Sequence, residues 1–252
     1  MPEISAVIIT FNEEANIERC LKSVRNVADE IIVVDSFSTD KTSEICSKYK
    51  ARFVHNTFNG YIEQKNFALS MAKYPVVLSL DADEALSAEL ENSILKVKED
   101  WRHDGYYCNR INNFYGKWMR HNSKYPDWVM RLFDKERGSW GGLNPHDRVE
   151  LRRGSSTARL KGNIEHYSYK SISEHINKVN LFTDIAANAY YKNNISAGYL
   201  KIFIHPAWKF FRELIIRRGI LDGYYGVVLG GIKSFETFLK YIKLRHLYRK
   251  SR

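Results

Sequence analysis

Apolar segments alternate with amphipathic ones up to residue 80, and this alternation limits the fold more than any other feature of the sequence. Four apolar segments are predicted strands, at residues 4–10, 30–35, 51–55 and 76–80. The segments between them have the spacing of helices, at 14–24, 42–50 and 61–73. Strands that are rich in Val, Ile and Leu and alternate with helices form parallel sheets covered on both faces. The sequence therefore predicts an α/β protein with a mainly parallel, Rossmann-like sheet flanked by helices.

Polar residues follow three of these strands at the point where each strand ends. They form the segments Thr10-Phe-Asn-Glu-Glu14, Asp35-Ser-Phe-Ser-Thr-Asp40 and Asp81-Ala-Asp83. In parallel sheets ligands bind beyond the carboxyl ends of the strands, so we expect the three segments to form one site. Asn12 is also expected to cap the helix at 14–24.

Asp81 and Asp83 are the most informative pair at this edge. Residues i and i+2 of a strand point to the same face, so the two carboxylates can converge on one point. Oxygen ligands of this kind suit Mg²⁺ or Mn²⁺, which bind one or two carboxylates together with water and the phosphates of a substrate. The alternative is an acidic turn that caps a helix at 85–97.

Length and composition are those of a globular protein. The chain has 252 residues, enough for one large α/β domain with an appendage, and a mean hydropathy of −0.43. Its three cysteines, Cys20, Cys46 and Cys108, lie far apart and indicate buried thiols in a reducing compartment. We find no apolar run long enough to span a membrane, and the early acidic residues are not expected of a signal peptide.

Basic charge is concentrated at the end of the chain. Residues 201–252 hold twelve Lys or Arg against three acidic residues, whereas the whole chain has a net charge of +10. The rest is therefore nearly neutral, which argues against a nucleic-acid partner. From residue 101 the pattern changes to short strands with aromatic loops, and near Ser171 it changes to helices. We therefore expect a catalytic domain at 1–170 and a basic, aromatic-rich helical extension at 171–252.

In order and spacing, these motifs resemble those of glycosyltransferase family 2, the inverting enzymes of the GT-A fold that use nucleotide sugars. The matching segments, within residues 4–170, are Thr10-Phe-Asn-Glu-Glu14, Val34-Asp35-Ser-Phe-Ser-Thr-Asp40 and Leu80-Asp-Ala-Asp-Glu84. A narrower resemblance is to the lipopolysaccharide-core β-glucosyltransferases. It rests on further segments, Gln64-Lys65-Asn66, Arg131-Leu-Phe133, Pro145-His146-Asp147 and Leu221-Asp-Gly-Tyr-Tyr-Gly226.

The resemblance implies a nucleotide-sugar pocket at the strand ends. Asp35 would accept a hydrogen bond from the N3–H of uracil, and Thr10, Asn12 and Glu13 would line the same pocket. Lys65, on the third predicted helix, would contact the pyrophosphate of the donor. The alternative for Lys65 is a solvated lysine on the helix surface.

The resemblance also implies a divalent cation, Mg²⁺ or Mn²⁺. Asp83 would bind the metal directly, and Asp81 would reach either the metal or the ribose of the donor. His166, in the segment Ile164-Glu-His-Tyr167, resembles the late histidine near the metal in such enzymes. A lone histidine is more often structural, so that alternative stays open.

A carboxylate from another part of the chain would act as the general base. Asp147 resembles this residue because it follows a glycine-containing loop at 141–146, although the subgroup often has Glu at the same position. Asp127 is the main alternative and Glu150 a weaker one. Three tryptophans are candidates for stacking on sugar rings or for filling a small core: Trp118, Trp128 and Trp140.

The function implied by the resemblance is an inverting, metal-dependent transfer of a sugar from a UDP-sugar, similar to UDP-glucose. The acceptor would be a hydroxyl of a cell-envelope glycolipid or oligosaccharide such as lipopolysaccharide core. Asp147 would deprotonate this hydroxyl while the metal stabilises the departing diphosphate. Two alternatives are a non-catalytic, membrane-associated nucleotide-sugar-binding module on the same scaffold and a phosphatase of the haloacid dehalogenase type. The phosphatase motif follows the first strand, whereas the acidic pair here follows the fourth.

The helical extension has the composition of helices that lie in the headgroup region of an anionic membrane. Residues 201–252 contain ten aromatic residues besides the basic ones. Apolar residues with helical spacing and basic neighbours are Ala207, Phe210, Phe211, Leu214 and Ile215. We expect a cytoplasmic protein that is peripheral on the cytoplasmic face of the inner membrane. Alternatively, these helices pack on the catalytic domain or on a second subunit.

Overall fold

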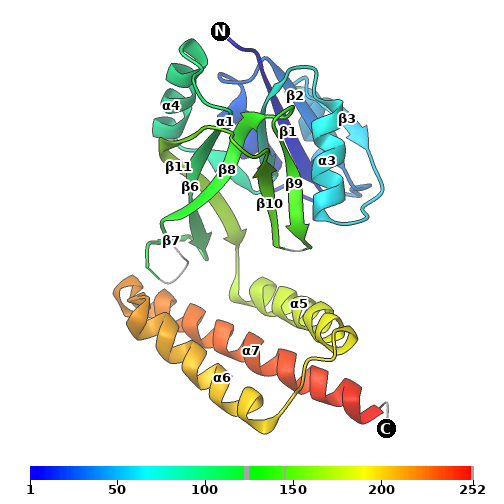
Figure 1. Cartoon of the computed structure of the whole chain (residues 1–252), viewed down its shortest axis with the longest axis vertical. Helices are drawn as coiled ribbons and strands as arrows, with labels where there is room; N and C mark the ends of the chain where they lie inside the picture. Colours follow the sequence, from blue (N-terminus) through cyan, green and yellow to red (C-terminus); the bar gives the residue numbers. More distant parts are fainter. Residues whose placement is uncertain (122–124, 145, 251–252) are drawn as a thin grey trace. The chain divides into compact units, whose positions relative to one another are not determined.

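The computed structural model describes residues 1–121, 125–144 and 146–250. The chain divides into two compact units (Figure 1). The first, which we call the sheet unit, comprises Met1–Ile111 and Pro126–Tyr167. The second, which we call the helical unit, comprises Asn112–Tyr125 and Ser168–Arg252.

Four parallel strands form one half of the sheet, in the order β3-β2-β1-β4. They are β1 (Ile4–Thr10), β2 (Glu30–Asp35), β3 (Arg52–His55) and β4 (Val76–Asp81). Every residue of β1 is buried, as expected of a central strand that is covered on both faces. The four predicted strands are therefore confirmed, and their parallel order brings their carboxyl ends to one edge.

Antiparallel strands complete the sheet, which is therefore mixed and not parallel throughout. The order continues as β4-β8-β6-β11-β5, with β7 beside β6. These strands are β5 (Glu84–Leu86), β6 (Gly105–Phe114), β7 (Lys117–Met119), β8 (Asp127–Asp134) and β11 (Thr157–Tyr169). A separate antiparallel hairpin, β9 (Gly138–Leu143) and β10 (His146–Leu151), pairs Asp147 with Gly142.

Helices cover both faces of the sheet. Three of them pack on one face: α1 (Ile17–Val24), α2 (Thr42–Lys48) and α4 (Ala88–Glu99). Helix α3 (Tyr61–Met71) packs on the other face of the sheet (Figure 1). Trp140 of the β9–β10 hairpin belongs to the same core cluster as α3. Alternate residues of β1 enter the two clusters, because side chains of a strand point to opposite faces in turn.

The loop after β1 differs from the prediction. Asn12 has a φ of 53°, and α1 begins only at Ile17, so Asn12 does not cap a helix. Its side-chain oxygen instead accepts a hydrogen bond from the Thr39 N–H at 2.8 Å, and its own N–H donates to the Ser38 hydroxyl at 2.7 Å. Asn adopts a positive φ more readily than most residues, and here it joins the loop after β1 to the loop after β2.

The segment after Asp83 also differs from the prediction of a helix at 85–97. Residues Glu84–Leu86 pair with β11 as a short strand before α4 begins. The N-cap of α4 is Ser87, whose hydroxyl accepts a hydrogen bond from the Leu90 N–H. The alternative in which the acidic residues serve as a helix cap is therefore wrong.

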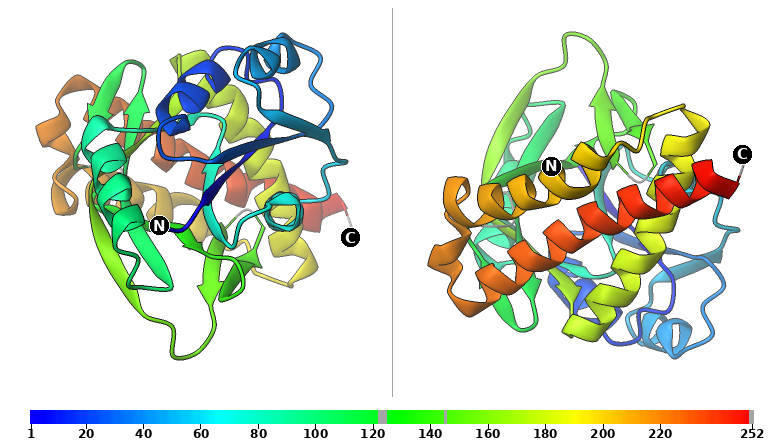
Figure 2. Two further views of the ribbon diagram at one scale, coloured as in Figure 1. Left: turned by 90° about the horizontal axis from the view of Figure 1, so that it is seen from above. Right: turned by 90° about the horizontal axis from the view of Figure 1, so that it is seen from below.

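The helical unit is built mainly from three helices, α5 (Ile172–Lys192), α6 (Tyr199–Phe211) and α7 (Tyr224–Lys250). A π-helical turn, η1 (Arg212–Ile216), and a 3₁₀ turn, η2 (Gly219–Asp222), connect α6 to α7. Helices α6 and α7 lie side by side, and α5 packs across α7 (Figure 2). A small core of Ala187, Ile202, Tyr241 and Leu244 holds the three helices together.

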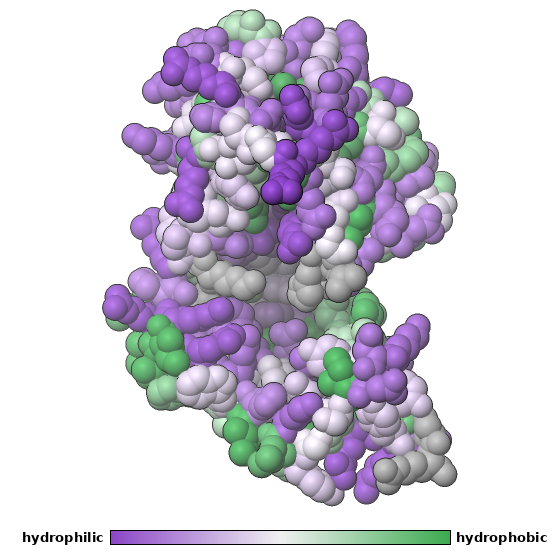
Figure 3. Space-filling view, in the orientation of Figure 1, coloured by the Kyte–Doolittle hydropathy of each residue, from purple (hydrophilic) through white to green (hydrophobic). Residues whose placement is uncertain are grey.

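The surface of the helical unit carries apolar patches bordered by hydrophilic side chains (Figure 3). Many of its large apolar side chains are exposed, among them Leu200 at 70% and Trp208 at 53%. Within the described residues, none of the helices combines the length and the apolar character that crossing a bilayer requires.

Candidate active site

Side chains at the carboxyl ends of β1, β2 and β4 lie next to one another. Thr10 pairs in register with Asp35 on β2, and Ile9 pairs with Asp81 on β4. The hydroxyl of Thr10 is buried and has no hydrogen-bond partner among the residues that the structure describes. A buried polar group without a partner is costly, so this hydroxyl is a candidate for contact with a ligand or water.

Asp35 is fully buried beneath the loop after β2. Its carboxylate accepts hydrogen bonds from the N–H and the hydroxyl of Ser38 and lies 3.2 Å from Nδ1 of His55. The His55 ring stacks on Phe37, which has a φ of 64° and is 55% exposed. The carboxylate is thus covered in this conformation, and Phe37 forms the outer surface of the loop. Recognition of a base by Asp35 stays a prediction.

Glu13 lies in the loop after β1 and is half-buried. Its N–H donates a hydrogen bond to the Thr42 hydroxyl at 2.9 Å, and its carboxylate accepts one from the Asn16 amide at 2.7 Å. These bonds fix the loop against the beginnings of α1 and α2. Glu13 therefore lies at the edge of the sheet where the strands end, as predicted. Its contact with a nucleotide stays a prediction.

Lys65 joins the parts of the site. It lies on α3 and is only 3% exposed, so the alternative of a solvated surface lysine is wrong. Its ammonium donates hydrogen bonds to Asp147 at 2.7 Å and to Oδ2 of Asp81 at 3.3 Å. Oδ1 of Asp81 lies 3.0 Å from the same ammonium but has no hydrogen bond. The structure therefore brings α3, β4 and β10 together at one buried cation.

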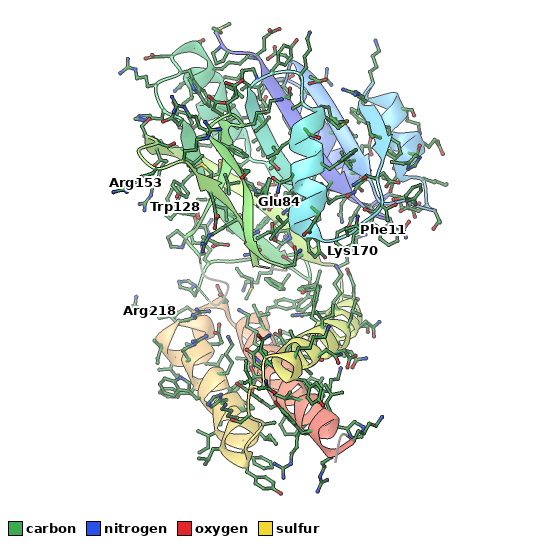
Figure 4. All side chains as sticks on the ribbon, turned by 45° about the vertical axis from the view of Figure 1, so that its right-hand side comes forward. Phe11, Glu84, Trp128, Arg153, Lys170 and Arg218 are labelled. Carbon is green, nitrogen blue, oxygen red and sulfur yellow. The ribbon has the colours of Figure 1, made fainter. Side chains whose placement is uncertain are left out.

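Glu84 and Arg131 form a buried ion pair next to Asp81. Glu84 lies inside the sheet unit (Figure 4). The Glu84 carboxylate accepts hydrogen bonds from Arg131 at 2.8 Å and from the backbone N–H of Asp81 at 3.1 Å. Arg131 also lies 3.4 Å from the Asp81 carboxylate. Burial raises the pKa of Asp81, but Lys65 and Arg131 outweigh burial and hold this pKa below its ordinary value. Asp81 is therefore ionised at neutral pH.

Ion pairs connect Lys65, Asp81, Arg131, Glu84, Arg110 and Asp127 in that order, and we call this series the charge network. Asp127 lies at the end opposite Lys65. Arg110 lies 3.5 Å from Glu84 and donates two hydrogen bonds to Oδ2 of Asp127, at 2.8 and 3.1 Å. Asp147 shares its cation directly with Asp81, whereas two arginines and Glu84 separate Asp127 from Asp81. Of the two candidates for the base, Asp147 is thus the one adjacent to the strand-end aspartate.

The weaker candidate for the base is Glu150, three residues after Asp147 on β10. The side chains of these two residues point to opposite faces of the β9–β10 hairpin. Its side chain is 49% exposed and pairs with Arg148 at 2.9 Å. Of the glycine-containing loop before Asp147, Pro145 lies outside the described residues. Gly142, opposite Asp147, has a φ of 97°, a conformation that glycine adopts without strain.

Asp83 and His166 form a second pair at this edge. Nε2 of His166 lies 3.2 Å from Oδ2 of Asp83, and about one fifth of each side chain is exposed, 22% and 21%. Among the described residues, no three His, Cys, Asp or Glu side chains are grouped so as to hold a metal ion. Mg²⁺ and Mn²⁺ bind few protein ligands and complete their shell with water and phosphate oxygens. The carboxylate of Asp83 and the imidazole of His166 are ligand types that suit such a cation, which would take its other ligands from water and a substrate.

The tryptophans do not gather at the strand ends as a group. Trp140 is 3% exposed and lies beneath two cations, with its ring centroid 4.3 Å from Lys65 and 5.1 Å from Arg131. It therefore belongs to the core. Trp128 lies under Arg159 at 4.7 Å and lines a surface hollow on β6, β8 and β11. Trp118 belongs to β7 of the helical unit.

A comparison with protein-family models decides the family. Residues 5–160 match the model described as Glycosyl transferase family 2. This chain belongs to glycosyltransferase family 2. Its mixed α/β sheet with helices on both faces is the GT-A fold, and its activity is that of a transferase.

Relatives of this glycosyltransferase share most of its length. An uncharacterized glycosyltransferase of Rickettsia bellii is 35% identical over 97% of this chain and 87% of its own length. The lipopolysaccharide core biosynthesis glycosyltransferase LpsC of Rhizobium meliloti is 28% identical over 96% of this chain and 93% of its own. A crystal structure of S. aureus TarS in complex with UDP aligns over 99% of this chain and 92% of that chain, with 16% identity and a TM-score of 0.47.

Three charged residues of this glycosyltransferase had no predicted role although they organise the site: Arg110, Arg131 and Glu84. A signal for two of them existed in the sequence. Arg131 stands inside the apolar segment Val129-Met-Arg-Leu-Phe133, and Glu84 follows the two aspartates directly. A charge inside a buried strand needs a partner of opposite sign. The presence of Arg131 in an apolar segment therefore indicates a buried carboxylate nearby, and Glu84 is that carboxylate.

Proposed function

We propose that this glycosyltransferase inverts the anomeric centre of a UDP-sugar as it transfers the sugar to a hydroxyl of a cell-envelope glycolipid or oligosaccharide, such as lipopolysaccharide core. The shared ammonium of Lys65 is the observation that carries the proposal. It holds Asp81, at the end of β4, and Asp147, from the β9–β10 hairpin, on one buried cation. A glycosyltransferase needs a positive charge that stabilises the departing diphosphate. It also needs, close by, a carboxylate that accepts the proton of the acceptor hydroxyl. The likeness to LpsC over nearly the whole chain supports the class of acceptor.

The nucleotide would bind across the ends of β1 and β2. The unpartnered hydroxyl of Thr10 is the buried donor and acceptor that a ligand would complete. Asn12 and Glu13 hold the adjoining loop in place. Because Ser38 covers Asp35, we propose that the uracil N3–H meets the pair of Asp35 and Ser38 after the Ser38 hydroxyl turns aside.

Mg²⁺ or Mn²⁺ would be held by Asp83 and His166, with Asp81 reaching the metal or the ribose. When bound, this cation would neutralise charge on the departing diphosphate. Lys65 would add positive charge at the same place from the protein itself. Two carboxylates beside one ammonium carry a net charge of −1, so a diphosphate suits this site only when it arrives with a divalent cation.

Asp147 would accept the proton of the attacking hydroxyl. Lys65 binds its Oδ2, which fixes the direction of the carboxylate and leaves Oδ1 as the oxygen for the acceptor. The base belongs to the β9–β10 hairpin and the diphosphate site to the sheet, so the two approach the sugar from different elements. Asp127 is the rival base, and its Oδ2 is already bound twice by Arg110.

A nucleotide-release assay tests the proposal. The full chain is incubated with a panel of UDP- and other nucleotide sugars, with Mn²⁺, with Mg²⁺ and with chelator, and free nucleotide is measured. We expect release from a UDP-sugar only with a divalent cation. Release of nucleotide that persists in chelator would contradict the proposed metal dependence. Binding of the donor without any release would support the non-catalytic binding module instead.

We also propose that the protein works on the cytoplasmic face of the inner membrane, where a glycolipid acceptor would be presented. The basic residues and exposed apolar side chains of the helical unit support this location. Vesicle flotation tests it.

A further inference from the structure

Basic side chains surround one buried carboxylate in the helical unit. Glu213, in η1, is 0% exposed. Four cations lie close to its oxygens: Lys209 at 3.4 Å, Arg212 at 3.2 Å, Arg217 at 3.0 Å and Lys233 at 3.3 Å. We call these five residues the Glu213 cluster. One carboxylate balances one of the four cations, so the cluster keeps an excess of three positive charges.

The five residues of the cluster carry more positive than negative charge. Burial lowers the pKa of Lys233 to about 8 and also lowers that of Lys209, although Glu213 acts in the opposite direction on both. Nε of Arg212 is buried and has no hydrogen-bond partner in the described part of the chain. The four basic side chains are between 20% and 36% exposed, so a second anion can reach them from solvent. Phosphate oxygens match guanidinium donors in both charge and geometry.

Exposed apolar side chains lie on η1 and on the helix that leads into it, α6. They include Leu200, Phe203, Ile204, Trp208, Phe211 and Ile215. Three residues of the stripe that the sequence predicts, Phe210, Phe211 and Ile215, are exposed. The buried positions of α6, Ile202 and Pro206, do not belong to that stripe. Apolar side chains of this size, bordered by Lys and Arg, are the arrangement of helices that lie at a membrane interface.

We propose that the Glu213 cluster binds the phosphate group of an anionic phospholipid while the apolar side chains of α6 and η1 enter the edge of the bilayer. The inference rests on the membrane location in the proposed function and adds the site and the headgroup chemistry. A second copy of the chain suits this face poorly, because residues 201–252 hold only three acidic residues and would bring like charges together. A phosphate headgroup supplies the missing negative charge and a lipid layer covers the apolar side chains.

The test is flotation of the full chain with vesicles of phosphatidylcholine alone or mixed with phosphatidylglycerol. The double variant Lys209→Gln/Arg212→Gln removes two charges and leaves Arg217 and Lys233 to pair with Glu213. One Lys or Arg near an anionic surface changes partitioning about fivefold, so we expect binding to the anionic vesicles to fall about 25-fold.

A matched control removes two charges elsewhere in the helical unit, with Lys192→Gln/Lys250→Gln. Both lysines are exposed and lie outside the Glu213 cluster. We expect this control to weaken flotation far less than the cluster variant. Equal losses in the two variants would reduce the effect to general charge attraction and overturn the proposal, as would unchanged flotation of the cluster variant.

Two further measurements separate the sources of the signal. Inorganic phosphate competes for the same donors, so it should weaken flotation more than chloride at the same ionic strength; equal weakening by the two salts would overturn the proposal. Binding of inorganic phosphate in calorimetry without flotation on anionic vesicles would assign the cluster to free phosphate, and the lipid assignment would fail. Self-association without vesicle binding, seen by sedimentation, would assign the face to a second copy and also overturn the proposal. Binding of UDP with Mn²⁺ should be the same in all variants, so failure of the proposed function would be visible separately.

Discussion

Replacing Lys65 with methionine removes the positive charge that Asp81 and Asp147 share. The Lys65 side chain is 4% exposed, that of Asp147 12% and that of Asp81 29%. Removing one partner of a buried ion pair costs about 3–5 kcal/mol, because the remaining charge stays desolvated. Arg131 still lies 3.4 Å from Asp81, and Asp81 has partial access to solvent, so we expect the lower end. The free energy of unfolding at pH 7 should fall by about 3 kcal/mol.

This loss is large enough to measure by thermal unfolding. For a chain of this size about 1 kcal/mol corresponds to about 2–4 °C in Tm, so Lys65→Met should unfold about 6–12 °C lower. The control is Lys48→Met, which removes an exposed lysine from an i,i+4 pair with Glu44 and should leave Tm unchanged. If Lys65→Met unfolded at the temperature of the control, the carboxylates would not depend on this cation and the reasoning would be refuted.

The dependence of this loss on pH gives a second test. The folded-state pKa of Asp81 lies below its ordinary value of 3.8. Ionised Asp81 therefore stabilises the fold at pH values above 3.8. This stabilisation is lost as the pH falls through the folded-state pKa. Lys65 is a main cause of the lowered pKa. The destabilisation by Lys65→Met should therefore be largest near neutral pH and shrink below about pH 4. A loss of equal size from pH 7 to pH 3, measured by denaturant unfolding, would contradict the charge argument.

Other predictions concern ligand binding. Asp83→Asn should abolish metal-dependent binding of UDP in calorimetry while circular dichroism stays unchanged, because it removes one ligand charge with little change of shape; metal-dependent binding like that of the wild type would overturn the assignment. Thr10→Val should weaken UDP binding about 5- to 10-fold, the value of about one hydrogen bond. It should not lower Tm, since the hydroxyl has no partner within residues 1–121, 125–144 and 146–250. A large drop in Tm with unchanged binding would make Thr10 a structural residue.

Much of the sheet could be predicted because its central strands are buried on both faces and read as continuous apolar runs. Strand β5 could not, because its three residues pair with β11, which lies some eighty positions away in the sequence. A segment this short has no periodicity of its own, so a helix beginning at once was the natural expectation. The same limit applies to Asn12, whose hydrogen bonds go to a loop on the neighbouring strand.

The predicted site residues lie at one edge, but the contacts between them could not be read from the sequence. Lys65 is the clearest case, because the buried residues of α3 include the polar pair Gln64 and Lys65 and no apolar stripe marks the inner face. Its burial follows from carboxylates contributed by β4 and β10, and this is a tertiary effect. Residue spacing alone cannot show which carboxylates converge on one cation.

The most direct test of the central claim is the turnover of Asp147→Asn beside Asp127→Asn in the nucleotide-release assay. The account predicts that Asp147→Asn lowers kcat about 10²–10⁴-fold, the usual contribution of a general base, while the affinity for UDP with Mn²⁺ is retained. Asp127→Asn should change kcat far less. The opposite order, with full turnover in Asp147→Asn and loss in Asp127→Asn, would contradict the account and assign the base to the Arg110 end of the charge network.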